Sequence, residues 1–526
     1  MQELPLNGFY SSESRKLTDR RCINWVPTLS DNGSLSAFSL MPSSGIEYLD
    51  NVGLVWSSEY GDGKITGQVG AFDGFNSLTQ FHVGRRIIGY NGVLGTTKLL
   101  PATPIVGGGT ITSSSAYSRF ASNGTDLVSV APSSYNSNQD RVYKYDDSLT
   151  PTAVDVATAL NTNTANIVDL AYLGARFLYL CAQKSSNPAF NFNRVHYSGL
   201  GGIAPNTLDF FTPQGNDEQL KGLEVLNDHL YLFAETQTFI YRVTESTDIP
   251  YQEVGTMEYG LDGTASAPQA KCKYKGTIAF YGRQKNGPTR IYLLSGSGAQ
   301  AISTKDVDRI IAQETNNIRL FAFTEKGREF LCVRSDTVCF VFEAETGIWH
   351  ERKTYPENSW QFVGATENAS GTGSVMIGAE FKETSIGRLF TGSGVHNPVL
   401  GTEVASPNNE SNESGIVNRE MISSPFNGKN DKIILAELQP QCEVDFSMPD
   451  SGWSKPEINI SVSYDFGNTF EKERSLNIGS IGDYKATTRF FNFGYVTQAF
   501  TVKLRAMNPY PTRVLTLLAR TEKGYS

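Results

Sequence analysis

The chain has 526 residues, of which 39% are hydrophobic and 11% aromatic, and this content is enough for a sizeable core and excludes wholesale disorder. Acidic residues outnumber basic ones by 54 to 45, a formal net charge of -9, which disfavours a tight grip on nucleic acid through clustered Lys and Arg. The 49 glycines and 22 prolines beside 24 tyrosines and 30 phenylalanines indicate short strands joined by turns, so we expect an all-β protein.

Residues 1–80 lack the repeat that follows them, and we interpret them as an N-terminal segment that closes or caps the next unit. The chain starts without the apolar stretch of a secretory signal, and no apolar run approaches the length of a membrane span. The six cysteines and five histidines do not show zinc-site spacing. We therefore expect folding in a reducing cytoplasm, free thiols, and no metal or other cofactor.

A hairpin recurs between residues 81 and 395 with a spacing of roughly 40 to 55 residues, which is the period of propeller blades. The first strands read RRIIGY (85–90), DLVSVA (126–131), RFLYLC (176–181), HLYLFA (229–234), TIAFYG (277–282), EFLCVR (329–334) and VMIGAE (375–380). The partner strands read TTKLLP (96–101), DRVYKY (140–145), NRVHYS (193–198), TFIYRV (238–243), TRIYLL (289–294), TVCFVF (337–342) and GRLFTG (387–392). This pattern predicts a β-propeller of six or seven blades; a β-sandwich or a run of unrelated hairpins is the alternative.

Helices are predicted to be rare. Residues 303–314 read STKDVDRIIAQE, in which Ser303 or Thr304 can cap a helix. The apolar stripe of this helix is formed by Val307, Ile310 and Ile311. A second, weaker helical pattern covers residues 154–161.

The end of the chain changes character twice. Residues 396–429 are polar and poor in aromatics, which predicts a linker or long loop. Residues 430–526 alternate apolar and polar positions in several runs, and we expect a C-terminal β-rich, sandwich-like domain there.

Local catalytic patterns are weak. LLSGSGAQ (293–300) does not have the helix that a serine nucleophile elbow needs, and Glu343 and Glu345 are expected to face solvent at a strand end. If residues 334–337 form a tight turn, Cys332 and Cys339 face each other across two strands as buried thiols. We therefore assign no catalytic, cofactor-binding or metal-binding residue, and expect a protein that is not an enzyme.

The segment SVSYDFGNTF (461–470) is similar to the Asp-box pattern S-x-D-x-G-x-T-[FW] of propellers such as sialidases, with Ser463, Asp465, Gly467, Thr469 and Phe470 at the matching positions. Asp465 can accept hydrogen bonds from N–H groups of its own turn, and Gly467 can supply a positive φ. Thr469 and Phe470 are expected to begin the next strand, with Phe470 packed inward. These roles are structural, so we interpret the segment as a hairpin turn.

Two regions resemble a known family. The order Arg21, Asn24, Trp25, Pro27 and then Ser44, Gly45, Ile46 resembles the "R-x-x-N-[YW]-x-P" region and "P-G-[LI]" turn of the packaged-DNA stabilisation proteins of short-tailed, podovirus-type bacteriophages, with Ser44 in place of the usual Pro. These are also called tail hub or nozzle proteins. In that family the Asp-containing turn precedes a Gly-rich segment, an Arg and an aromatic-x-x-G step. The corresponding positions here are Gly479, Gly482, Arg489, Phe491 and Gly494, and AISTKDVDRII (301–311) resembles the family's helix start.

The resemblance implies a virion structural protein of the phage tail, assembled in the host cytoplasm. It implies a ring, usually a homo-hexamer, below the portal and the head-to-tail adaptor, which extends the DNA channel and helps retain packaged DNA until genome ejection. It further implies contacts with tail fibres or tailspikes and with tail-tip or needle proteins, while double-stranded DNA passes without specific binding. The alternative is a sialidase-like propeller glycoside hydrolase or a glycan-binding adhesin, which a panel of fluorogenic glycosides and a glycan array would distinguish.

Overall fold

The computed structural model of the 526-residue chain describes the following residues: 1–6, 9–10, 21–30, 37–44, 46–51, 65–69, 79–83, 86–91, 96–98, 119–131, 141–145, 151–154, 165–183, 194–215, 218–262, 269–296, 298–314, 318–335, 337–353, 360, 362–367, 375–379, 385–389, 417–427, 432–444, 456–479, 487–497, 499–508 and 511–524.

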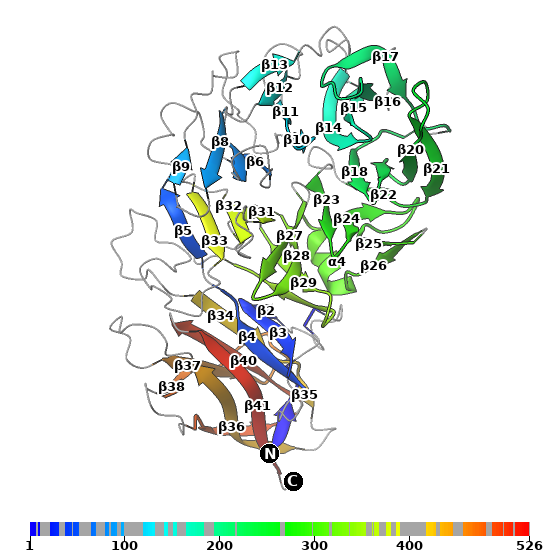
Figure 1. The fold of residues 1–526 in the computed structure, drawn as a ribbon. Helices are drawn as coiled ribbons and strands as arrows, with labels where there is room; N and C mark the ends of the chain where they lie inside the picture. The colour runs from blue at the N-terminus through cyan, green and yellow to red at the C-terminus, as the bar shows by residue number, and fades with distance from the viewer. Residues whose placement is uncertain are drawn as a thin grey trace.

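Seven blades of antiparallel strands form a β-propeller, which occupies the upper part of Figure 1. Blades 1 and 2 contain β6 (Ile65–Val69), β7 (Thr79–Val83), β8 (Arg86–Asn91), β9 (Thr96–Lys98), then β10 (Arg119–Ser122), β11 (Leu127–Ala131), β12 (Arg141–Tyr145) and β13 (Pro151–Val154). Blades 3 and 4 contain β14 (Ala165–Leu173), β15 (Arg176–Gln183), β16 (Arg194–Ser198), β17 (Pro205–Phe211), then β18 (Gly222–Leu226), β19 (His229–Phe233), β20 (Thr238–Val243) and β21 (Tyr251–Met257).

Blade 5 has five strands, β22 (Gly260–Leu261), β23 (Lys271–Tyr274), β24 (Thr277–Arg283), β25 (Arg290–Ser295) and β26 (Gly298–Ala301). Blade 6 contains β27 (Arg319–Glu325), β28 (Arg328–Arg334), β29 (Cys339–Glu343) and β30 (Ile348–Glu351). Blade 7 contains β31 (Phe362–Glu367), β32 (Val375–Ala379), β33 (Ser385–Leu389) and, from near the start of the chain, β5 (Ile46–Asn51).

The repeated hairpin of the sequence is the middle pair of strands in blades 2 to 7, whereas in blade 1 it is the last pair, β8 and β9. For example, HLYLFA and TFIYRV became β19 and β20, which pair directly in the register His229↔Arg242 to Phe233↔Thr238. The prediction of an all-β propeller with a C-terminal sandwich is confirmed, and the described residues form seven blades. The hairpin stands out in the sequence because its two strands are the most continuously apolar in a blade.

A buried network of charged side chains ties the innermost strands of blades 2 to 5 together. Asp169 on β14 lies between Lys271 of β23 (Oδ2–Nζ 3.2 Å) and Arg119 of β10 (Oδ1–Nε 3.7 Å). Lys271 also contacts Glu224 of β18 at 3.1 Å. Burial alone would lower the pKa of Lys271, but the two carboxylates outweigh burial and raise it, so its ammonium is stabilised in the charged form.

The lower part of Figure 1 is a β-sandwich built from both ends of the chain. One sheet has the order β3 (Trp25–Leu29), β4 (Phe38–Pro42), β41 (Thr512–Lys523), β36 (Ile433–Val444) and β39 (Phe490–Val496), with β1 (Gln2–Leu4) also paired to β41. The other has the order β2 (Cys22–Ile23), β34 (Val417–Ile422), β40 (Ala499–Asn508), β37 (Glu457–Ser463) and β38 (Arg474–Asn477), with β35 (Phe426–Asn427) also paired to β40. Buried side chains of β36 and β41 belong to the same apolar core as those of β37 and β40.

The element boundaries differ from the sequence prediction in two places. β34 and β35 fall inside the interval 396–429, and β34 alternates buried and half-buried residues as a sandwich strand should. The sandwich strands therefore begin before residue 430. At the other end, β6 and the first two residues of β7 precede residue 81, while β5 pairs with β33 from Ile46↔Leu389 to Asn51↔Ser385.

The predicted helix at residues 303–314 is present as α4 (Lys305–Ile311). Thr304 is its N-cap and accepts from the Val307 N–H, and Val307 and Ile311 are buried. Of the second predicted helix, residues 155–161 lie outside the described residues, and β13 ends at Val154. Within the described parts of the chain, no helix is long and apolar enough to cross a membrane.

Candidate functional site at the propeller–sandwich junction

The residues of the N-terminal motif meet where blade 6 touches the sandwich. Arg21, Asn24, Trp25 and Pro27 all lie in or beside the short strands β2 and β3. Gly45, in the turn that follows, lies outside the described residues. The structure therefore brings the four residues of the "R-x-x-N-[YW]-x-P" pattern to one junction.

Glu351, the last residue of β30, is the centre of the junction and is only 4% exposed. Its carboxylate accepts two hydrogen bonds from the Arg21 guanidinium, Nε to Oε1 and Nη2 to Oε2, both 2.9 Å, and one from the Tyr10 hydroxyl. Lys353 adds a cation 3.5 Å from Oε2. Burial alone would raise the pKa of Glu351, but Arg21 and Lys353 outweigh burial, so the pKa lies below its ordinary value and the carboxylate stays ionised.

Asn24 connects the two domains through all of its polar side-chain atoms. Its Nδ2 donates to the carbonyl oxygens of Lys353, beside blade 6, and of Asn418, in β34 of the sandwich, each at 2.9 Å. Its Oδ1 accepts from the Lys353 N–H at 3.0 Å. The backbone is left-handed, with a φ of 54°, a conformation that Asn tolerates better than most residues. An Asn therefore suits this position both for its conformation and for its paired amide groups.

Trp25 and Pro27 belong to the sandwich side of the junction. Trp25 is fully buried, and its indole Nε1–H donates to the carbonyl oxygen of Thr512 at 2.9 Å. Pro27 lies on β3 and pairs with Leu40 of β4. Among the described residues β3 is an edge strand of its sheet, where the missing N–H of proline is tolerated.

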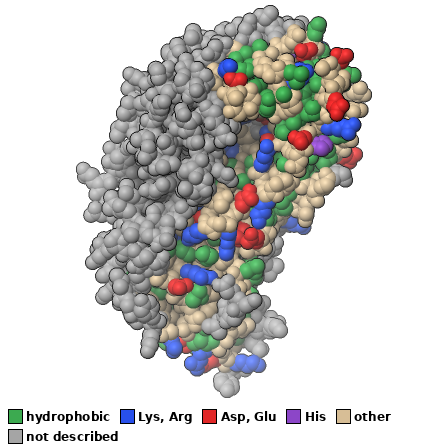
Figure 2. Space-filling model, viewed as in Figure 1, with side chains coloured by type: hydrophobic (Ala, Val, Ile, Leu, Met, Phe, Trp, Pro, Cys, Tyr) green, Lys and Arg blue, Asp and Glu red, His purple; other side chains and the backbone are tan. Residues whose placement is uncertain are grey.

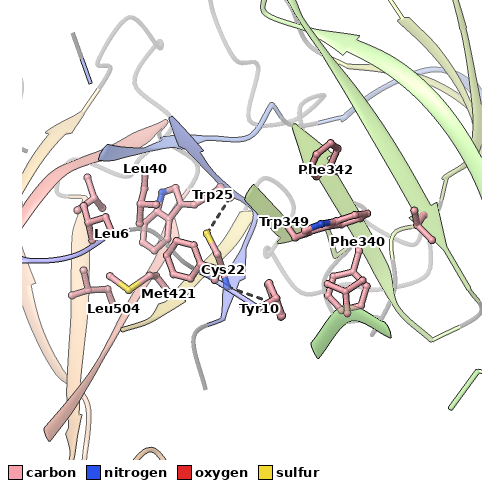
Figure 3. Packing of buried hydrophobic residues seen from close by; sticks show 14 of the residues in the cluster. Leu6, Tyr10, Cys22, Trp25, Leu40, Phe340, Phe342, Trp349, Met421 and Leu504 are labelled. Atoms are coloured by element: carbon pink, nitrogen blue, oxygen red, sulfur yellow. Dashed lines mark hydrogen bonds between the residues drawn. The ribbon is translucent and has the colours of Figure 1, made fainter. Parts of the chain in front are cut away.

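The apolar core is continuous through the junction. In Figure 3, Trp25, Leu6 and Leu40 lie on the sandwich side and Trp349, Phe340 and Phe342 on the propeller side, with Tyr10 and Cys22 between them. The rings of Tyr10 and Phe340 meet edge to face at 5.1 Å between centroids.

A second buried ion pair lies beside the first. Glu325 and Arg352 are 3% and 1% exposed in their side chains and form a salt bridge. Glu325 also accepts from the backbone N–H of Ser44 at 2.5 Å, and Lys326 donates to the carbonyl oxygen of Pro42 at 3.0 Å. These contacts attach the end of β4 and the residues that follow it to blade 6.

Sequence reasoning missed Tyr10, Glu325, Glu351 and Arg352. Their partners lie 27 to 341 residues away, so no local spacing could have paired them. The available signal was the presence of charged residues at the ends of otherwise apolar strands, as in IWHE and RLFAFTE.

The Asp-box-like turn lies in the sandwich, in the connection between β37 and β38. Asp465 Oδ1 accepts from the Ser463 hydroxyl at 2.6 Å and from the Thr469 N–H at 2.8 Å, and Oδ2 accepts from the Thr469 hydroxyl at 2.6 Å. These bonds, led by the one from Ser463, lower the pKa of Asp465 to about 2. Gly467 has the predicted positive φ, 88°. The Asp465 carboxylate thus closes its own turn, and both of its oxygens accept hydrogen bonds from residues of the same segment.

Two details of the predicted turn are wrong. The next strand begins at Arg474 instead of Thr469, because β37 and β38 are separated by a longer connection. Phe470 is only half-buried, and it lies under the Lys503 ammonium at 5.6 Å from the ring centroid. Phe466 also takes a positive φ, 60°, which the pattern did not indicate.

Two other sequence expectations can be compared with the structure. Glu343 is 1% exposed and pairs with Arg328 at 3.2 Å, so the expectation that it faces solvent is wrong; Glu345 is exposed. Cys332 and Cys339 have their Sγ atoms 3.3 Å apart as free thiols. They are diagonal neighbours, because Cys332 is directly opposite Val341 and Cys339 is opposite Arg334. Within the described residues, no group of three or more His, Cys, Asp or Glu side chains is arranged to hold a metal ion.

The fold and junction define a two-domain all-β protein, a seven-bladed propeller joined to a sandwich that both chain ends build. Residues 126–393 match the family model described as "Bacteriophage P22 Gp10, beta-propeller", and residues 419–522 match the one described as "Bacteriophage P22 Gp10, beta-sandwich". The chain therefore belongs to the bacteriophage P22 Gp10 family and is a phage structural protein of the virion.

Other comparisons gave only distant similarity. No curated protein matches the chain. Among solved structures, an exo-β-1,3-galactanase from Phanerochaete chrysosporium is 12% identical, with a TM-score of 0.31, over 78% of this chain and 97% of that chain. PorZ from Porphyromonas gingivalis is 11% identical, with a TM-score of 0.33, over 72% of this chain and 43% of that chain. The β-propeller domain of Cps50 (Swd1) from Myceliophteria thermophila is 9% identical, with a TM-score of 0.36, over 63% of this chain and 98% of that chain.

Proposed function

We propose that this protein is a structural subunit of a phage tail, the hub or nozzle ring below the portal and its adaptor. In this role it extends the DNA channel, helps retain packaged DNA, and offers attachment for tail fibres or tailspikes and for tip or needle proteins. The observation that carries the proposal is the match of both domains, in the same order, to the P22 Gp10 propeller and sandwich models. The proposed ring is a homo-hexamer that assembles in the host cytoplasm.

The net negative charge of the chain supports a channel through which DNA can slide. The formal net charge is -9, whereas a DNA-gripping surface needs clustered Lys and Arg. Figure 2 shows acidic and basic side chains interspersed over the described part of the visible face, from the propeller to the sandwich. Such a surface favours contact with DNA that is weak and independent of sequence.

The N-terminal motif and the Asp-containing turn have structural roles in this proposal. Arg21, Asn24, Trp25 and Pro27 join the domains, and Ser463, Asp465, Gly467 and Thr469 close a turn. We propose that neither set performs catalysis and that the protein is not an enzyme. We also propose that the division of the chain into an N-terminal segment, a propeller, a linker and a C-terminal domain holds in solution, with β34 counted in the sandwich.

The test is assembly with the portal–adaptor complex of the phage that encodes the protein. The purified protein is added to that complex and followed by mass photometry and negative-stain electron microscopy. We expect a mass increase of about six subunits, by the closed symmetry usual for such rings, and a new ring below the adaptor. A protein that stays monomeric and never joins the complex would contradict the proposal. So would rapid cleavage of fluorogenic glycosides, the result expected of a hydrolase.

A further inference from the structure

Blade 6 and one sheet of the sandwich are a single sheet, joined through a strand of only two residues. Ile23 of β2 pairs in parallel with Glu351 of β30, and on its other side it pairs with Glu420 of β34. The result is a sheet of ten strands that runs from the propeller into the sandwich. A two-residue strand offers few backbone hydrogen bonds, so the link depends on the side chains around it.

The side chains beside β2 fasten it on both sides. Arg21 holds Glu351 of the propeller with two hydrogen bonds, while its carbonyl oxygen accepts from the Ile422 N–H of the sandwich at 2.8 Å. Asn24 holds Lys353 on one side and Asn418 on the other. Each of these two residues therefore contacts both domains at once.

The same N-terminal segment continues into both domains. β1, β3 and β4 pair within the sandwich, and β5 completes blade 7. Residues 21–24, which we call the strap, lie in the chain between β1 and β3.

We propose that the strap is a conformational coupling device, which makes the propeller and the sandwich move and unfold as one body. Release of the Arg21–Glu351 contact converts the protein into two bodies that open separately. The inference does not depend on the proposed place in the tail, because it concerns the isolated chain and is tested on it.

The chain offers a closely matched control. Arg328 and Glu343 also pair a partly exposed Arg with a buried Glu, with side chains 31% and 2% exposed against 39% and 6% for Arg21 and Glu351. Both strands of the control pair, β28 and β29, lie inside blade 6. Loss of the control pair should therefore weaken blade 6 without separating the domains.

The experiment compares Glu351→Gln with Glu343→Gln in the full chain, by calorimetry and by hydrogen exchange measured on peptides. We expect Glu351→Gln to split one thermal transition into two. We also expect amide exchange in β36 and β40 of the sandwich to rise by about tenfold or more, while blades 3 and 4 keep their wild-type protection. Glu343→Gln should raise exchange in β28 and β29 and keep a single transition.

The opposite pattern overturns the proposal. If Glu351→Gln keeps one transition and raises exchange evenly over both domains, the strap is ordinary packing. The same conclusion follows if Glu343→Gln releases the sandwich equally well. If Glu351→Gln does not fold, Arg21→Gln and Arg328→Gln replace the pair, since both arginines are partly exposed. Faster exchange of the sandwich in Arg21→Gln alone supports the strap, and unchanged exchange refutes it.

Discussion

The junction and the Asp-containing turn both place a carboxylate under several hydrogen-bond donors, yet their surroundings are opposite. Glu351 is 4% exposed and is held by residues 330 and 341 positions away. Asp465 lies in an exposed connection and is held by residues two and four positions away. The comparison teaches that the number of hydrogen bonds does not decide which carboxylate contributes more to stability. Burial and sequence separation decide it, because a buried group that loses its partner cannot bind water instead.

Sequence separation matters for a second reason. The contacts of Asp465 lie within one short segment, so they can form in the unfolded chain and differ little between the two states. The contacts of Glu351 close loops of hundreds of residues, so they exist only in the folded protein. Changes at the junction should therefore alter global stability, and changes at the turn should act locally.

The largest expected effect at the junction comes from Trp25→Ala. Trp25 is fully buried in the core that spans both domains, so its removal leaves a large cavity and takes away the indole hydrogen bond to the Thr512 carbonyl. We expect the free energy of unfolding to fall by about 3–5 kcal/mol, measured by urea denaturation followed by circular dichroism. Trp25→Phe is the control that keeps most of the volume. A loss below about 1 kcal/mol for Trp25→Ala would show that the junction core is not well packed.

The next effect tests the buried ion pair beside the strap. Arg352→Met leaves the Glu325 carboxylate buried and, among the described residues, facing the Ser44 N–H and Lys326 alone, so we expect a loss of about 3 kcal/mol in the free energy of unfolding. The double variant Glu325→Leu with Arg352→Met removes both charges and should recover much of that loss. Both are measured by the same urea titration. If the double variant were as unstable as the single one, the attraction between Glu325 and Arg352 would exceed the free-energy cost of removing both charges from water.

The fold was largely predictable from sequence because it rests on local alternation. The hairpins β19–β20 and β28–β29 are runs of apolar residues, and such runs identify buried strands without any knowledge of their neighbours. The helix α4 was equally local, with its cap and stripe within eight residues. The same reasoning could not show that β5 joins blade 7, because strand pairing between distant segments leaves no local periodicity.

The site was predictable only in part. The residues Arg21, Asn24 and Trp25 were identified through a family resemblance, but their partner Glu351 was not. Glu343 was misjudged because alternation at a strand end predicts solvent exposure, whereas Arg328 provides a partner that allows burial. Charged residues on inner strands, such as Lys271, pose the same difficulty: their partners come from other blades.

A third prediction uses pH to separate the two carboxylates. Glu351 faces Arg21, Lys353, Tyr10 and the buried thiol of Cys22. Burial opposes and Arg21 favours its ionisation, and the net result holds the pKa of Glu351 below its ordinary value of 4.5. Stability from this contact is thus complete above the ordinary value and is lost as the pH falls through the lower folded value.

We therefore expect the melting temperature of the sandwich transition in Glu351→Gln to depend less on pH than the melting temperature of the wild type, measured between about pH 3 and 6. At neutral pH the same variant should lose about 1.5–3 kcal/mol, the usual contribution of a charge-assisted hydrogen bond. Glu343→Gln is the control, since burial raises the pKa of Glu343 and its charged form is not favoured in the fold. Equal pH dependence of the wild type and Glu351→Gln would contradict the assignment.

The smallest effect is expected at the turn. The pKa of Asp465 is lowered from 3.8 to about 2, so its contribution is present above pH 3.8 and is lost as the pH falls through about 2. Asp465→Ala removes the acceptor for Thr469 and for the Ser463 hydroxyl; water can reach Thr469, which is exposed, while the buried Ser463 oxygen still accepts from the Gly467 N–H at 2.8 Å. The melting temperature should fall less than that of the sandwich transition in Glu351→Gln, and hydrogen exchange should rise at residues 463–471 only. Asp465→Asn, which keeps one acceptor oxygen, should lie between Asp465→Ala and the wild type. A loss of protection in Asp465→Ala that spread to β36 and β41 would show that the turn supports the whole sandwich, and the contrast with the junction would then fail.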